Sequence, residues 1–339
     1  MAANRSAMLS APILYPNMVV MIERDITGPI AWRGAELGPD PGRIRIEADA
    51  LAELDALAAE LADNPLPLAA LRPGDFDLPR LSALMARVAR ELEEGRGFVI
   101  LDRLPMERLA PDTARAIYWL LGSMIARPVA QKWDGTMIYD VHDTGRPPGN
   151  GVRPDQTNAE QNFHTDNSYN NCSPAYVGLL CVRTARSGGV SHIVSFAAAH
   201  NELRRRHGNL LPRLYQPFHF DRQREHAPGD VMTTWHAMFE DHAGRLRARL
   251  SRFQVVNGYK LAGAELDADG AAAMAALEDV MNAPGMGVDF HFKPGEMQFL
   301  DNRRIGHRRT GFEDWPEADR KRLLVRLWLR NEGRPFYNG

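Results

Sequence analysis

The spacing of apolar residues predicts three helices and a short strand in the first third of the chain. Residues 45–62 are rich in Ala and Leu at helical spacing, and the apolar residues of 81–92 fall on one helical face. A third helix is predicted over 111–124, where most positions are apolar. The run Phe-Val-Ile-Leu at 98–101 follows two glycines and predicts a short buried strand.

The pattern changes from Trp133 onward. Short apolar runs there alternate with clusters of Gly, Pro, Asn and Asp, which is typical of antiparallel strands. Residues 145–158 have no periodicity and predict a long polar loop that could act as a lid. Helical spacing returns at 197–206 and 270–282. Without an internal repeat or a linker, the chain is predicted to be one α+β domain with a mostly antiparallel β core.

Composition and charge narrow the class of protein. The 339 residues are 44% apolar and 25% charged, as in an average soluble globular protein. The net charge of −2 favours neither nucleic acid nor a membrane surface as partner. The early apolar run 18–22 is too short for a signal peptide or a membrane span. Cys172 and Cys181 are expected to be buried thiols in a reducing cytoplasm, and the oligomeric state stays open.

Histidine is the residue type that points to chemistry. The chain has no P-loop, dinucleotide-binding glycine motif, zinc-protease helix or nucleophile elbow, but it has 11 histidines. On a strand, Asn162, His164 and Asp166 would lie on one face. A distant histidine would then complete the two-histidine, one-carboxylate triad of non-haem iron oxygenases. Asn162 itself would either line the pocket or cap the preceding loop.

A second His-x-Asp pair weakens the first as a signal, because 11 histidines make one chance pair unsurprising. This second pair is His219 and Asp221, whose neighbours are arginines and a glutamate. That setting favours a charge-satisfied strand or loop. The pair His164 and Asp166 instead follows the long polar loop and precedes an apolar strand at 174–182, so we prefer it.

The C-terminal segment supplies the third histidine and two arginines. Residues 294–300 predict a turn and a strand, and 301–307 a polar loop that delivers His307. A later strand would place Arg322 and Arg326 on one face. Arginines on an apolar strand are unfavourable unless they meet anions, and their planar fork suits a carboxylate. A dicarboxylate co-substrate would fit. The arginines at 303, 304, 308 and 309 are interpreted mainly as a solvated basic patch, of which one could reach the site.

In combination, these motifs resemble a known family. His164-x-Asp166, the Ser-Gly-Gly turn at 187–189, His307 and the Arg322/Arg326 strand, in this order, resemble the TauD/TfdA dioxygenases. The segment 301–326 also resembles the related clavaminate-synthase-like branch. The resemblance covers about residues 95–335. It implies a double-stranded β-helix, or jelly-roll, core over about 96–335, which follows a helical part over about 1–95 within a single domain.

The resemblance implies that His164, Asp166 and His307 hold Fe(II) and form the catalytic centre. 2-Oxoglutarate and O2 would be consumed while an unactivated C–H bond of a small-molecule substrate is oxidised, with succinate and CO2 as co-products. Hydroxylation is the default outcome, and desaturation or ring formation are the alternatives. Outside this class, a non-catalytic jelly-roll binding protein or a metal-dependent hydrolase or isomerase using the same ligands remains open.

The resemblance also assigns the groups around 2-oxoglutarate. Its distal carboxylate would meet Arg322, with Ser191 as the hydroxyl partner at a position where relatives more often have threonine. Arg326 would lie near the inner carboxylate or near an acidic group of the substrate, and the two arginines could exchange roles. Asn162 is placed with them as a candidate binding residue. From Arg326 we expect a small polar and acidic substrate, such as an amino acid or related acid.

Overall fold

The computed structural model of the protein describes residues 21–147 and 152–339. Its α-helices are α1 (Ala48–Asp63), α2 (Pro79–Glu93), α3 (Pro111–Ile125), α4 (Phe196–His207), α5 (Leu211–Leu214), α6 (Arg252–Ala262) and α7 (Ala268–Asn282). Its strands are β1 (Arg43–Arg45), β2 (Phe98–Asp102), β3 (Ile138–Val141), β4 (Gln161–His164), β5 (Tyr176–Arg183), β6 (Ser187–Gly188), β7 (Ser191–Ser195), β8 (Pro217–Asp221), β9 (Thr233–Ala237), β10 (Phe239–His242), β11 (Arg245–Ala248), β12 (Gly287–Phe290), β13 (Met297–Asp301), β14 (Ile305–Arg309), β15 (Phe312–Glu313) and β16 (Leu323–Leu329).

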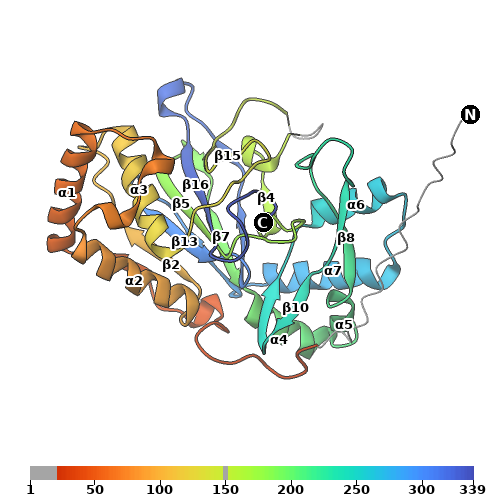
Figure 1. Ribbon diagram of the computed structural model, residues 1–339. Helices are drawn as coiled ribbons and strands as arrows, with labels where there is room; N and C mark the ends of the chain where they lie inside the picture. Colours follow the sequence, from red (N-terminus) through yellow and green to blue (C-terminus); the bar gives the residue numbers. More distant parts are fainter. Residues whose placement is uncertain (1–20, 148–151) are drawn as a thin grey trace, which may run out of the picture.

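The helices α1, α2 and α3 lie together on one side of the molecule (Figure 1). Their apolar faces share one buried cluster with side chains of β2, β5, β13 and β16. Pro79 begins α2, and the Glu53 carboxylate of α1 accepts hydrogen bonds from the backbone N–H groups of Arg80 and Leu81 (3.0 and 2.6 Å). A helix leaves its first N–H groups without partners, so this carboxylate caps α2 and fixes it to α1.

Two sheets form the β core. The larger has the strand order β1-β2-β13-β5-β16-β3, and the smaller has the order β12-β7-β14-β4. Val177 and Trp328 of the first share a buried cluster with Phe163 and Ile193 of the second. The sheets therefore pack against each other, which confirms the α+β class and the jelly-roll core expected from the resemblance.

A long insertion between β7 and β12 contains α4 to α7 and two hairpins, and it lies on the opposite side from α1 to α3 (Figure 1). Helix α6 was not predicted. Ser251 caps its first turn by accepting a hydrogen bond from Gln254, and Gly263 ends it with a φ of 63°. Ser251 also forms a β-bridge with His164, so the start of α6 lies beside the end of β4.

Several local expectations need correction. His307 lies within β14 instead of at the end of a polar loop, because the chain turns back after Asp301. Asp166 lies beyond the end of β4. Of the predicted polar loop, residues 148–151 fall outside the described residues.

Both cysteines are free, but only Cys181 is fully buried, so the expectation of two buried thiols was half right. Among the described residues, no helix has the length and apolar character needed to span a membrane. The division into one domain stays a prediction.

Candidate active site

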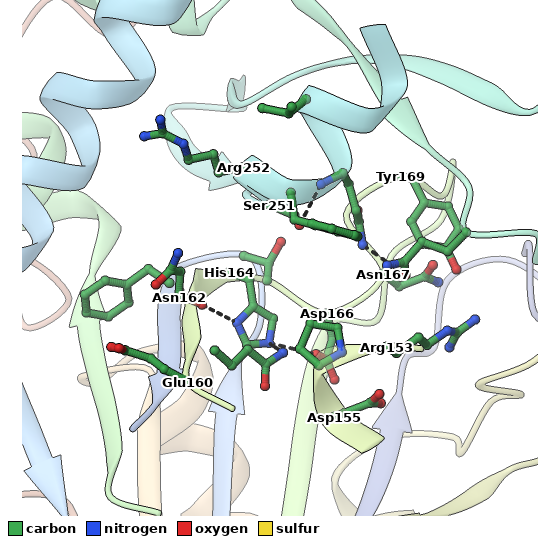
Figure 2. Close-up of a pocket in the computed structure, with 18 of the residues that line it drawn as sticks. Arg153, Asp155, Glu160, Asn162, His164, Asp166, Asn167, Tyr169, Ser251 and Arg252 are labelled. Carbon is green, nitrogen blue, oxygen red and sulfur yellow. Dashed lines mark hydrogen bonds and ion pairs between the residues drawn. The ribbon is translucent and has the colours of Figure 1, made fainter. Parts of the chain in front are cut away.

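The register between β4 and β14 brings two histidines together. His307 pairs directly with His164 across the antiparallel strands, and their ring centroids are 4.2 Å apart. Oδ1 of Asp166 lies 3.5 Å from Nε2 of each ring. The three ligand atoms lie within 4.8 Å of one another, and within 21–147 and 152–339 no other His, Cys, Asp and Glu side chains form such a group. Figure 2 shows His164 and Asp166 facing the same cavity.

Asp166 is held in place by contacts to other elements. Its backbone N–H donates to Oδ1 of Asn302 (2.7 Å), and Nδ2 of Asn302 donates to its carbonyl (3.0 Å). Its Oδ2 accepts a hydrogen bond from the Trp328 indole (2.6 Å) and lies 3.3 Å from Nη1 of Arg326. Because Oδ2 is occupied, Oδ1 is the atom left to face the two histidines.

The charges at this centre suit a metal ion. Burial alone would raise the pKa of Asp166, but Arg326 and the two histidines outweigh it and hold the pKa well below its usual range. Burial, with the neighbouring His164, lowers the pKa of His307 to about 4. A carboxylate beside a neutral imidazole is the ligand state that metal binding requires.

The second nitrogen of His164 fixes the ring for metal binding. Nδ1 lies 2.9 Å from the carbonyl of Asn162, so it carries the proton and leaves the lone pair on Nε2. The Gln161 amide lies 2.9 Å from that Nε2. Asn162 therefore contributes its backbone to the ring's orientation, while its side chain is exposed and lines the larger cavity described below.

A small pocket of about 50 Å³ adjoins the three candidate ligands and contains two buried arginines. Arg322 is 5% exposed, forms no ion pair with any described residue, and leaves its Nη1 without a hydrogen-bond partner. Burial, reinforced by the nearby Arg309 charge, lowers the pKa of Arg322 to about 10. Ser191 of β7 pairs with Arg309 of β14, and both line this pocket. It is a site suited to a carboxylate.

Arg326 differs from Arg322 because it has partners within the chain. Its Nη2 lies 3.2 Å from Asp155 and its Nη1 lies 3.3 Å from Asp166, while Nε donates to Gln131 (2.8 Å). The expectation of a second anion beside Arg326 came from its position on an apolar strand. These carboxylates already neutralise it, so that reason for an acidic substrate is wrong.

A larger cavity of about 390 Å³ opens on the other side of His164 and Asp166. Its wall combines the segment around Asp155, the turn after Asp166, the start of α6 and the Arg326/Trp328 face of β16. Charged and amide side chains predominate near the labelled residues of Figure 2. The cavity is large enough for a small polar molecule.

The second His-x-Asp pair lies elsewhere. The His219 ring packs 4.0 Å from that of Trp235, and Asp221 accepts a hydrogen bond from the backbone N–H of Gln223 (2.7 Å). Neither belongs to the metal-ligand group. A strand and turn therefore explain this pair, as its sequence context indicated.

The arginines near His307 are not a solvated patch, because each binds a protein group. Arg303 pairs with Glu332 (2.9 Å), Arg304 with Asp301 (2.6 Å) and Arg308 with Glu160 (3.2 Å). Arg309 is buried in the small pocket and donates to the carbonyl of Thr157 (3.0 Å). It is the one that reaches the site.

Sequence reasoning missed several residues of the site. Gln161, Asp155 and Asn302 reach it from loops or strand ends, where no periodic pattern marks them. The alternation along β16 did place Trp328 on the face of Arg326, and this was the one available signal for its role. Contact with Asp166 could not be read from that alternation.

Residues 62–328 match the sequence model of the family described as "Taurine catabolism dioxygenase TauD, TfdA family". FR-33289 synthase of Streptomyces rubellomurinus is 28% identical over 327 residues, which cover 94% of this chain and 94% of that protein. Taurine hydroxylase-like protein SAT17 of Stachybotrys chartarum is 23% identical over 337 residues, which cover 96% of this chain and 84% of that protein.

Solved structures show the same fold. An asparagine oxygenase in complex with Fe(II), 3-hydroxyasparagine and succinate superimposes with a TM-score of 0.63 at 18% identity, covering 85% of this chain and 93% of that one. The non-heme iron oxygenase OrfP in complex with (3S)-hydroxy-L-Arg gives a TM-score of 0.65 at 16% identity, covering 86% and 94%.

Proposed function

This chain belongs to the TauD/TfdA family and is a dioxygenase that uses iron(II) and 2-oxoglutarate, and from this premise we propose that it hydroxylates a small polar molecule. The proposed substrate is an amino acid or a related acid, oxidised at an unactivated C–H bond. The observation that carries the proposal is the meeting of a three-ligand group, a carboxylate-binding pocket and a polar cavity at one point.

We assign the iron to His164, Asp166 and His307. The residues present fit such an ion, because two imidazole nitrogens and one carboxylate oxygen converge from one side. Asn302 and Trp328 fix the carboxylate, and the Asn162 carbonyl fixes the His164 ring. With O2 and 2-oxoglutarate, the bound iron supplies oxidation of the C–H bond, with release of succinate and CO2.

We assign the distal carboxylate of 2-oxoglutarate to Arg322, with Ser191 as its hydroxyl partner. The support is the buried Nη1 of Arg322, which has no partner among the described residues, beside a serine on the neighbouring strand. Arg326 is less suited to this role because two carboxylates of the chain already hold it. Arg309 adds a second positive charge to the same pocket.

The substrate is proposed to occupy the larger cavity, beside His164 and Asp166. Its polar wall supports a small hydrophilic molecule. The asparagine oxygenase and OrfP complexes contain hydroxylated amino acids, which supports an amino acid or related acid. Since Arg326 has internal partners, the acidic group rests on this likeness and not on an unpaired arginine.

The test is succinate formation from 2-oxoglutarate with Fe(II), ascorbate and air, in the presence of a panel of amino acids and related acids. A substrate should increase succinate release and gain one oxygen atom, as measured by mass spectrometry. Asp166→Ala should show neither effect. If the wild-type protein forms no more succinate than Asp166→Ala, the proposed function is wrong.

A further inference from the structure

The larger cavity contains buried polar atoms that no other group of the protein satisfies. Oδ1 of Asp155 and both Oδ1 and Nδ2 of Asn167 are buried and lack hydrogen-bond partners. The two residues are only 6% and 4% exposed. A buried polar group without a partner costs about 1–3 kcal/mol, so such atoms beside a reaction centre point to a ligand.

Asp155 lies where the two pockets join, because it lines both. Its Oδ2 is 3.2 Å from Nη2 of Arg326, which leaves Oδ1 as the unpaired atom. Arg326 also lies 3.3 Å from Asp166, a proposed iron ligand. The ion pair with Arg326 therefore fixes the Asp155 carboxylate close to the place where the substrate is oxidised. Figure 2 shows Asp155 below Asp166 in the cavity wall.

Asn167 follows Asp166 and has a φ of 57°, a left-handed conformation that is uncommon for residues other than glycine. The turn is held by neighbours. Asn170 donates its N–H to the Asn167 carbonyl (3.2 Å), and the Ser168 hydroxyl lies within hydrogen-bond distance of the Thr165 and Leu250 carbonyls (2.7 and 3.0 Å). This fixed turn places the Asn167 amide in the cavity wall. Exchange of the amide oxygen and nitrogen would still leave one acceptor and one donor unpaired.

We infer that Asp155 and Asn167 are specificity-determining residues that bind a nitrogen-bound hydrogen of the substrate next to the reacting carbon. The inference rests on the proposed function of this site. The unpaired atoms comprise two acceptor oxygens and one donor nitrogen, so the matching group must offer hydrogens to Asp155 and Asn167. An ammonium group or an amide N–H has that chemistry, and a neighbouring oxygen of the substrate accepts from Nδ2 of Asn167.

Binding can be measured without turnover, in anaerobic protein loaded with Fe(II) and 2-oxoglutarate. The ligands are the standard L-amino acids, each compared with its N-acetyl form and with the acid that has hydrogen in place of the nitrogen group. Isothermal titration should find a bound amino acid or N-acetyl form whose nitrogen-free counterpart binds about 10- to 100-fold more weakly. The first two forms distinguish an ammonium group from an amide N–H.

Asp155→Asn is the sharpest variant. Arg326 requires an oxygen acceptor, so the new amide would keep its oxygen toward Arg326 and present NH2 to the cavity in place of Oδ1. The variant should lose the preference for the nitrogen-containing ligand, with little change for the nitrogen-free acid. Glu160→Gln is the matched control, because it removes a carboxylate from the same cavity wall where Glu160 is exposed and paired with Arg308. It should keep the preference.

Asn167→Gly tests the second residue without backbone strain, since glycine adopts positive φ freely. It should weaken binding of the nitrogen-containing ligand about tenfold. Unchanged thermal unfolding and iron stoichiometry would show that each variant is folded.

The inference is overturned if nitrogen-free acids bind the wild-type protein as tightly as their parents. It is equally overturned if Asp155→Asn and Glu160→Gln change the preference alike. Succinate formation by a protein that binds none of the nitrogen compounds would also overturn it, while leaving the dioxygenase function intact. Absence of succinate formation would instead count against the proposed function.

Discussion

The Trp328 indole donates a hydrogen bond to Oδ2 of Asp166 over 2.6 Å, from the larger sheet to the turn that follows β4 of the smaller sheet. Arg326, two residues earlier on β16, lies 3.3 Å from the same oxygen. Together they occupy one side of the carboxylate and leave Oδ1 facing His164 and His307. The packing of the two sheets thus sets the direction of a proposed metal ligand.

Trp328→Phe should therefore weaken iron binding. The substitution keeps most of the buried ring but removes the N–H that orients Asp166. Loss of such a supporting hydrogen bond typically lowers metal affinity about 10- to 100-fold. Anaerobic Fe(II) titration measures the effect. Trp315→Phe is the control, because Trp315 stacks on Arg320 (3.7 Å) away from the candidate ligands. Equal affinities in both variants would contradict the role of Trp328.

Metal stoichiometry should distinguish the two His-x-Asp pairs. We expect one Fe(II) per chain in the wild-type protein and in His219→Ala and Asp221→Ala, but none held tightly by Asp166→Ala. The reason is that only His164, Asp166 and His307 converge among the described residues. Metal analysis after anaerobic gel filtration gives the ratio. Loss of iron on changing His219 or Asp221 alone would show that the wrong pair was chosen.

Arg322→Ala should raise the 2-oxoglutarate requirement. Removal of one partner from a desolvated ion pair costs about 2–5 kcal/mol, equivalent to roughly tens- to thousands-fold in affinity. The measurement is the 2-oxoglutarate dependence of succinate formation, with Arg320→Ala as a control at a half-exposed side chain. Arg326→Gln should mainly reduce stability, since Arg326 links Asp155 and Asp166. An unchanged requirement in Arg322→Ala, with a large change in Arg326→Gln, would exchange the roles.

Acid should destabilise the protein partly through His236. Burial, with the nearby Arg249 charge, lowers the pKa of His236 to about 3. In the unfolded chain its pKa is about 6.5, so between these values the unfolded state binds a proton that the native state does not. Stability must then fall as the pH drops, by roughly 1–2 kcal/mol between about pH 7 and 5.

Urea unfolding at these two pH values compares the wild-type protein with His236→Gln. The variant should be less stable at neutral pH if it loses the contact of Nε2 with the Tyr169 carbonyl (3.2 Å), but its stability should change less with pH. Parallel pH dependence in the two proteins would rule out His236 as a source of acid sensitivity.

Local spacing was enough to find most of the helices. The bounds of α1, α2, α3, α4 and α7 lie within a few residues of the predictions, because each buries one apolar face and leaves the other polar. Helix α6 lacked that signal, since Phe253, Val256 and Leu261 are exposed while Val255 and Tyr259 are buried. Its end signals, Ser251 and Gly263, were present in the sequence and would have indicated it.

The sequence alone determined which residues could serve as metal ligands. His164 and Asp166 are two positions apart, and the order of motifs through His307, Arg322 and Arg326 resembles one family. It also determined that Arg326 and Trp328 share a face of β16, because side chains alternate along a strand. These are statements about neighbours in sequence or about the order of motifs.

Only the tertiary structure decided which groups meet. His307 is opposite His164 because β14 pairs with β4 in that register, and a shift of one residue would turn its side chain away. Asp155 neutralises Arg326 from 171 positions earlier in the chain, whereas Arg322, on the same strand face, is left without a carboxylate. Charge pairing depends on distance in space, which the packing of the two sheets fixes and the spacing along one strand does not.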